Sequence, residues 1–169
     1  KICLFTSAIL LSNYQVHAIE IVDVELQLLI DISGSVNTSE YNLQMQGYQA
    51  AFESDTVQDA IINGHYGQIA VQLIMWSGRY QQQIMLDWAL IDSDTSADNF
   101  ANDIAALTRP FSGMTAIGSA IAFSYPQFST NDFIGTTQVI DISGDGTTNS
   151  GTSVSVASPD ALNAGVDTI

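Results

Sequence analysis

The sequence predicts an α/β protein with a doubly wound, mostly parallel central sheet, one antiparallel edge strand and helices on both faces. Strand-like apolar segments alternate along the chain with segments whose apolar residues recur at helical spacing, as in proteins of this class. The tight turn at Ser77-Gly78 joins two strand-like segments directly, so we expect that pair to be antiparallel. A chain of 169 residues with 46% hydrophobic residues suits one domain with its own core.

The expected elements follow one another through short connections. The first strand, residues 22–30, alternates at its start and becomes wholly apolar at Leu28-Leu29-Ile30, which indicates a strand inside a covered sheet. The further strands are expected at 68–76, 82–90, 137–142 and 166–169, and the helices at 38–52, 57–62, 96–107, 116–125 and 158–164. Thr38 or Ser39 is the expected cap of the first helix, and Pro159 is expected in the first turn of the last one. Residues 144–155, rich in Gly, Ser and Thr, are expected to form an exposed loop.

The first 18 residues have the order of a secretory signal peptide. Lys1 precedes an apolar run of about ten residues, and Ala18 ends a stretch suited to cleavage. The run is too short to span a bilayer, which needs about 20 residues; a buried first strand or helix is the alternative interpretation. We therefore expect a secreted or periplasmic domain at residues 19–169, with no membrane insertion after signal removal. Cleavage would also remove Cys3, the only cysteine, and with it disulfides and thiolate metal sites.

The charge balance limits the partners. The chain has 18 acidic residues against 3 Lys and Arg, a net charge of −15. Such a surface repels nucleic-acid phosphates and anionic lipids, so nucleic-acid binding and polybasic membrane docking are excluded. A metal cation or a cationic protein face would be attracted, although the same acidity also serves solubility and does not by itself identify a ligand.

Polar clusters follow or flank several of the predicted strands. Asp31, Ser33 and Ser35 come directly after the first strand, Thr115 precedes a helix, and Asp145 follows the strand at 137–142. In open α/β sheets, ligands gather at the carboxyl ends of the strands. Hydroxyl and carboxylate oxygens are hard ligands suited to Mg²⁺, Ca²⁺ or Mn²⁺. The alternative is that the first cluster forms a helix-capping turn and that Thr115 is a simple helix cap.

The spacing of these clusters resembles a known site. An Asp-x-Ser-x-Ser after an apolar strand, a later loop threonine and an Asp-Gly after a further strand resemble the metal-ion-dependent adhesion site (MIDAS) of von Willebrand factor type A (VWA) domains. The similarity runs through LLIDISGSV, GQIAVQLIMWSG, GMTAIGSAI and VIDISGDGTTN and covers about residues 22–169; the wider sequence also resembles an uncharacterised bacterial secreted family of VWA type. This resemblance implies a Rossmann-like VWA fold whose last strand and helix are missing from the chain.

The resemblance also implies a role for each residue. Ser33, Ser35 and Thr115 would bind the ion through their hydroxyls. Asp31 and Asp145 would hold it directly or through water. Mg²⁺ is the expected ion, with Mn²⁺ or Ca²⁺ as alternatives, and an open coordination position would accept a Glu or Asp from an unknown protein partner.

The third cluster departs from the family pattern. It reads Ser-Gly-Asp-Gly where many relatives have Thr-Asp-Gly, so Asp141 competes with Asp145 as the late carboxylate. Asp145 is favoured because it is expected in the loop, whereas Asp141 is expected inside the strand. Residues 141–152 also faintly resemble a calcium-binding EF-hand loop, but Thr152 stands where that loop has its Glu.

The expected function is adhesion-type protein binding and not catalysis. His65 would be the only histidine left after signal removal, which disfavours a Ser-His-Asp triad, and no glycine-rich phosphate loop with a lysine occurs. Three alternatives stay open: a metal-assisted phosphohydrolase, a non-catalytic subunit of a larger enzyme complex, and a structural domain whose metal only joins the loops.

Overall fold

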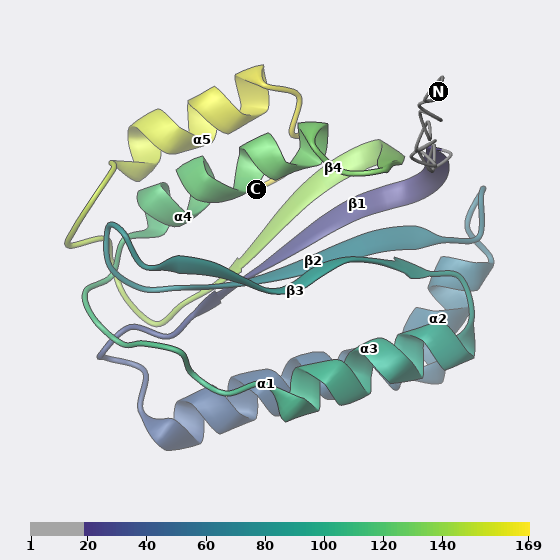
Figure 1. The fold of residues 1–169 in the computed structure, drawn as a ribbon, viewed down its shortest axis with the longest axis horizontal. Coiled ribbons are helices and arrows are strands. Elements are labelled where there is room, and N and C mark those ends of the chain that lie inside the picture. The colour runs from purple at the N-terminus through teal and green to yellow at the C-terminus, as the bar shows by residue number, and fades with distance from the viewer. Residues whose placement is uncertain (1–18) are drawn as a thin grey trace, which may run out of the picture.

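Four strands run through the middle of the molecule: β1 (Glu20–Asp31), β2 (Ile69–Trp76), β3 (Gln82–Ile91) and β4 (Phe133–Ser143). They form one sheet in the order β3-β2-β1-β4 (Figure 1). β1 is parallel to both β2 and β4, whereas β3 is antiparallel to β2, as the tight turn between them predicted. The computed structural model describes residues 19–169, so the signal peptide predicted for residues 1–18 lies outside the described residues.

Helices cover both faces of this sheet. One face carries α1 (Thr38–Phe52), α2 (Asp55–Ile62) and α3 (Asp94–Ala106), and the other carries α4 (Ile117–Ser124), the 3₁₀ helix η1 (Tyr125–Ser129) and α5 (Val154–Asn163) (Figure 1). An apolar core fills the space on each side. The doubly wound α/β architecture is therefore confirmed. Within residues 19–169 no helix combines the length and the apolar character needed to cross a membrane.

β1 contributes to both cores at once. Leu28 and Ile30 pack on the side of α1 and α3, whereas Leu29 between them packs on the side of α4 and α5. β2 is buried along its whole length. Both strands thus have the continuous apolar character of strands covered on two faces.

Two polar side chains in the middle of β1, Glu25 and Gln27, are also buried. Glu25 is 1% exposed, and its carboxylate accepts hydrogen bonds from the Asn131 side chain (2.7 Å), the Gly135 N–H (2.9 Å) and the Gln138 side chain (3.2 Å). Gln27 is fully buried and donates to a side chain of β2 and to the last carbonyl of α4. These bonds offset the cost of removing charged and amide groups from water.

The start of the first helix differs from the predicted one. Asn37, and not Thr38 or Ser39, caps α1, because its side chain accepts the N–H groups of Ser39 (2.8 Å) and Glu40 (3.1 Å). The Glu40 carboxylate accepts the Asn37 N–H in return, at 2.8 Å. This reciprocal pair is a capping box displaced by one or two residues from the expected position.

The last helix begins earlier than predicted. α5 starts at Val154 after a cap at Ser153, so Pro159 lies inside the helix and not in its first turn. β4 likewise begins at Phe133, ahead of the predicted residue 137. The strand expected at 166–169 is represented by one parallel bridge, between Thr168 and Val139 of β4.

The carboxyl ends of the three parallel strands lie level at one edge of the sheet. Asp31 of β1 is opposite Trp76 of β2, and Ile30 is opposite Ser143 of β4. The loops that follow these strands and the loop before α4 gather at this edge, on the left in Figure 1. All the polar clusters singled out in the sequence belong to these loops.

At the opposite edge, Asp23 fastens the connection between α2 and β2. Its carboxylate accepts the N–H groups of Tyr66 (3.0 and 3.1 Å to the two oxygens) and Gly67 (3.0 Å). Desolvation favours the neutral form of Asp23, but hydrogen bonds from the backbone of residues 65–68 outweigh it and lower the pKa. The ionised carboxylate is therefore the form that holds this connection.

We expect Asp23→Asn to lower Tm at neutral pH and the difference from wild type to shrink below about pH 4. A carboxylate with a lowered folded-state pKa stabilises the fold above its unfolded pKa and loses that effect as pH falls through the folded value. Thermal unfolding followed by circular dichroism across this range measures the effect. Asp103→Asn, the same change at an exposed site on α3, is the matched control. A Tm difference independent of pH would contradict the assignment.

Candidate metal centre

Asp31 organises the loop that follows β1. It is the last residue of that strand, it is fully buried, and its Oδ1 accepts the N–H of Ser33 at 2.7 Å. Ser33 is fully buried as well, whereas Gly34 and Ser35 are exposed. The carboxylate therefore shapes the turn, and the backbone passes from the buried interior to the surface between Ser33 and Ser35.

Four of the five predicted ligands meet in this structure. The hydroxyl oxygens of Ser33 and Ser35 lie 3.0 Å apart, within hydrogen-bond distance. The Ser35 hydroxyl also donates to Asp145 Oδ1 at 2.8 Å, across 110 positions of sequence. Together with the bond between Asp31 and Ser33, these contacts connect two carboxylates and two hydroxyls at one point of the sheet edge.

Thr115 joins this group through its loop. The Gly34 N–H donates to the carbonyl of Gly113 at 2.8 Å, so the loop before α4 lies against the serine loop. Thr115 is 5% exposed. Its N–H donates to Asn149 Oδ1 and its carbonyl accepts the Asn149 N–H, both at 2.9 Å. Asn149, which was expected only in an exposed loop, thus positions Thr115 through its backbone.

Asp141 and Asp145 occupy different environments. Asp141 lies on β4 as predicted, and its Oδ2 accepts the hydroxyl of Tyr48 from α1 at 2.7 Å. Burial raises the pKa of Tyr48, which keeps the phenol protonated as the donor. Asp145 lies in the loop and contacts Ser35. Asp145 thus contacts a serine of the first cluster, whereas Asp141 contacts α1.

The donor set suits a hard divalent cation. Asp31 Oδ2 is buried and has no hydrogen-bond partner within residues 19–169. Burial raises the pKa of Asp31, hydrogen bonds from Ser33 oppose the rise, and the charge of Asp145 adds to it. A cation beside the two carboxylates would favour the ionised form of Asp31 and so oppose the rise of its pKa. A Cβ on Gly144 would stand 3.0 Å from Asp31 Oδ2, so glycine keeps the space beside this oxygen open.

The predicted ligand set contains two carboxylates and three hydroxyls, of which the structure connects both carboxylates and the hydroxyls of Ser33 and Ser35. Within residues 19–169, no group of three or more His, Cys, Asp or Glu side chains is placed to hold a metal ion. Such a mixture of neutral and charged oxygens is compatible with Mg²⁺, Mn²⁺ or Ca²⁺.

Arg109 supports the serine loop from behind, which the sequence did not indicate. Its guanidinium donates to the carbonyls of Ile32 (2.8 Å), Ser33 (3.0 Å) and Val36 (2.8 Å). The guanidinium carbon also lies 5.4 Å from the centre of the Tyr41 ring, in cation–π range. Arg109 is therefore a positioning residue for the loop that contains both serines.

We expect Arg109→Gln to lower the free energy of unfolding by about 2 kcal/mol, because it leaves partly buried carbonyls without their charged donor. Arg109→Lys retains the charge but loses the fork that reaches three carbonyls, so it should fall between Gln and wild type. Urea denaturation measures both. Arg79→Gln, which removes the same charge at an exposed position, should change stability by less than about 0.5 kcal/mol. An equal loss in the Arg79 and Arg109 variants would contradict the role of the loop contacts.

The fold matches several solved structures. Proximal thread matrix protein 1 from the mussel byssus, in a structure with a zinc-occupied MIDAS motif, matches with a TM-score of 0.67 at 18% identity, over 89% of this chain and 38% of that one. An aerotolerance-related membrane protein from Bacteroides fragilis matches with a TM-score of 0.54 at 20% identity, over 86% of this chain and 65% of that one. The pilus adhesin SpaC from Lactobacillus rhamnosus GG matches with a TM-score of 0.54 at 17% identity, over 75% of this chain and 15% of that one.

These similarities establish a VWA-like α/β fold, and at such identities they establish the fold alone. The chain spans less than two thirds of each of these three proteins. A comparison of the sequence with curated proteins finds no match. The model of the family described as "Protein of unknown function (DUF1194)" matches residues 21–169, and the chain therefore belongs to that family.

Proposed function

We propose that this domain binds a protein partner through one divalent cation, with Mg²⁺ as the expected ion. The ligands would be the hydroxyls of Ser33, Ser35 and Thr115 and the carboxylates of Asp31 and Asp145. One observation carries the proposal: the Ser35 hydroxyl joins Ser33 to Asp145 beside a buried carboxylate oxygen of Asp31 that has no partner in the described part of the chain.

Each residue of this set has a distinct part. Asp31 is buried and holds the Ser33 N–H, so it supplies charge from beneath and shapes the loop. Ser35 and Asp145 are exposed, so the side of the site they form faces solvent and a partner. A cation held largely by neutral hydroxyls keeps positive charge and would attract a Glu or Asp from that partner.

The comparisons support this proposal at the level of fold. One structural neighbour is described with a metal-occupied MIDAS motif, and another is a pilus adhesin. The proposal includes a location outside the cytoplasm, supported by the signal-like order of residues 1–18. It assigns no catalytic residue, because the site offers hydroxyls and carboxylates arranged as ligands and not a nucleophile paired with a base.

We expect Asp31→Ala or Ser35→Ala to weaken the affinity for Mg²⁺ at least about tenfold, a loss of about 1.4 kcal/mol. Each substitution removes one of the five proposed ligand side chains. Isothermal titration calorimetry with Mg²⁺, Mn²⁺, Ca²⁺ and Zn²⁺ measures the affinities and ranks the ions.

Asp141→Ala is the matched control for these variants. Asp141 is the same residue type, only four positions before Asp145, but it contacts Tyr48 and not the serines. Its loss should leave the metal affinity unchanged. Trp76 gives a second readout, because a Cβ on Gly144 would stand 3.0 Å from Asp31 Oδ2 and 3.5 Å from the Trp76 ring, so the ring lies close enough for its fluorescence to respond to the ion. Equal metal binding by wild type and Asp31→Ala would contradict the proposal.

We expect the domain to capture secreted or surface proteins in Mg²⁺ and to release them on chelation. A pull-down with wild type and Ser35→Ala, with and without chelator, tests this, because the partner would need the ion held at this site. Retention of the same proteins after chelation, together with a lowered Tm, would instead favour a metal that only joins the three loops.

A further inference from the structure

An exposed aromatic and cationic pair lies on the turn between β2 and β3. Tyr80 is 84% exposed, the largest fraction among the exposed large hydrophobic residues of the described part of the chain. The Arg79 guanidinium carbon lies 5.0 Å from the centre of the Tyr80 ring. Met114, on the loop before α4, is 54% exposed. Tyr, Arg and Met are enriched in protein interfaces, and Tyr and Arg dominate their binding energy. We call these three residues the hairpin patch.

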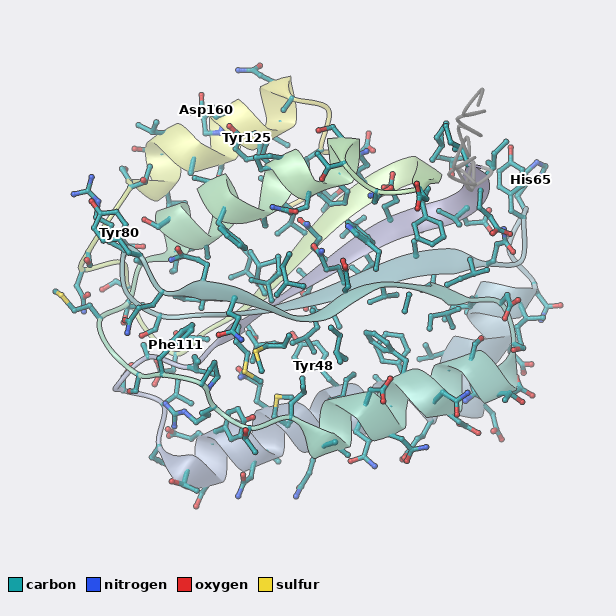
Figure 2. The ribbon with its side chains drawn as sticks, viewed as in Figure 1. Tyr48, His65, Tyr80, Phe111, Tyr125 and Asp160 are labelled. Atoms are coloured by element: carbon teal, nitrogen blue, oxygen red, sulfur yellow. The ribbon has the colours of Figure 1, made fainter. Side chains whose placement is uncertain are left out.

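The hairpin patch adjoins the candidate metal centre. The Ser77 hydroxyl donates to the Met114 carbonyl, and the Ala116 N–H donates to the Ser77 carbonyl, both at 2.9 Å. These two bonds hold the turn against the loop that contains Thr115. That loop in turn contacts Gly34, between the two serines. Tyr80 projects at the same end of the sheet (Figure 2), so the patch and the serine loop share one edge.

The charge of the hairpin patch is opposite to that of the rest of the surface. The whole chain has a net charge of −15 and three basic residues. Lys1 lies outside the described residues, and the Arg109 guanidinium is bonded to loop carbonyls. Residues 19–169 contain no lysine, and Arg79 is the arginine of that range whose side chain is exposed. An acidic partner is repelled by most of this surface and attracted to the sheet edge that Arg79 would share with a bound cation.

We propose that the partner of the metal site is an extended acidic segment with two carboxylates, one directed to the ion and one to Arg79. An apolar or aromatic residue of the same segment packs on Tyr80 and Met114. This inference rests on the proposed metal-dependent binding. It adds the chemical class of the binding partner and the residues of this domain that select it. Arg79 binds the second carboxylate through its planar fork of donors, and the exposed ring loses little conformational freedom when it is covered.

Selection from a library of displayed random peptides tests the proposal. The library is bound to the wild-type domain in Mg²⁺ and eluted with EDTA. We expect the recovered peptides to contain two acidic residues and at least one apolar or aromatic residue. The most enriched peptide is then synthesised, and its affinity is measured by fluorescence polarisation against wild type, Arg79→Gln, Arg79→Lys, Tyr80→Ala and Asp31→Ala.

Arg79→Gln and Tyr80→Ala should each weaken peptide binding about tenfold while leaving the calorimetric Mg²⁺ affinity unchanged, and Arg79→Lys should recover part of the loss. Replacing the second acidic residue of the peptide by its amide should weaken binding to wild type but not to Arg79→Gln.

The outcomes separate this inference from the function on which it rests. Metal-dependent binding of peptides with a single carboxylate, equal in wild type and Arg79→Gln, overturns the role of the hairpin patch and leaves the metal site intact. Binding that survives EDTA and the Asp31→Ala change overturns the proposed function. Failure to recover any peptide that needs Mg²⁺ counts against both.

Discussion

The parallel pairing of β1 with both β2 and β4 is the constraint on which the site depends. It places Asp31 beside Trp76 and Ile30 beside Ser143, so residues far apart in sequence leave the sheet at the same level. The pairing is held by burial, since β1 sends alternate residues into two cores. A shift of one residue in β1 would exchange those faces, so that each apolar side chain would point into the core on the opposite side of the sheet. The position of Asp31 is therefore determined by the packing of residues that have no part in binding.

Most of the fold could be predicted because its signals are strong and local. Continuous apolar runs identified β1 and β2, and the Ser77-Gly78 turn identified the antiparallel pair. The errors lie where two local signals compete. Asn37 is as good a helix cap as Thr38. Asn37 is favoured because its own N–H donates to the Glu40 carboxylate while its side chain accepts the Glu40 N–H. Pro159 usually marks a first turn, but the cap at Ser153 starts α5 earlier and the proline is accommodated inside.

The candidate site could be predicted only in part, for a physical reason. Its proposed ligands act through side chains of a restricted chemical type, so Asp31, Ser33, Ser35 and Asp145 are visible as a pattern. Arg109 and Asn149 act on backbone atoms of other loops. Any segment offers such atoms, so no spacing in the sequence indicates those contacts. The residues that position the site are therefore harder to predict than the residues that form it.

β1 contains two buried carboxylates in different environments. In the middle of the strand, both oxygens of Glu25 accept hydrogen bonds from amide and backbone donors. At the carboxyl end, Asp31 has one buried oxygen without a hydrogen-bond partner among residues 19–169. One strand thus carries a fully hydrogen-bonded carboxylate and, six residues later, a carboxylate with one unpartnered oxygen. Of the two buried carboxylates of β1, Asp31 at the carboxyl end of the strand is therefore the one that still offers an approaching small cation a charged oxygen.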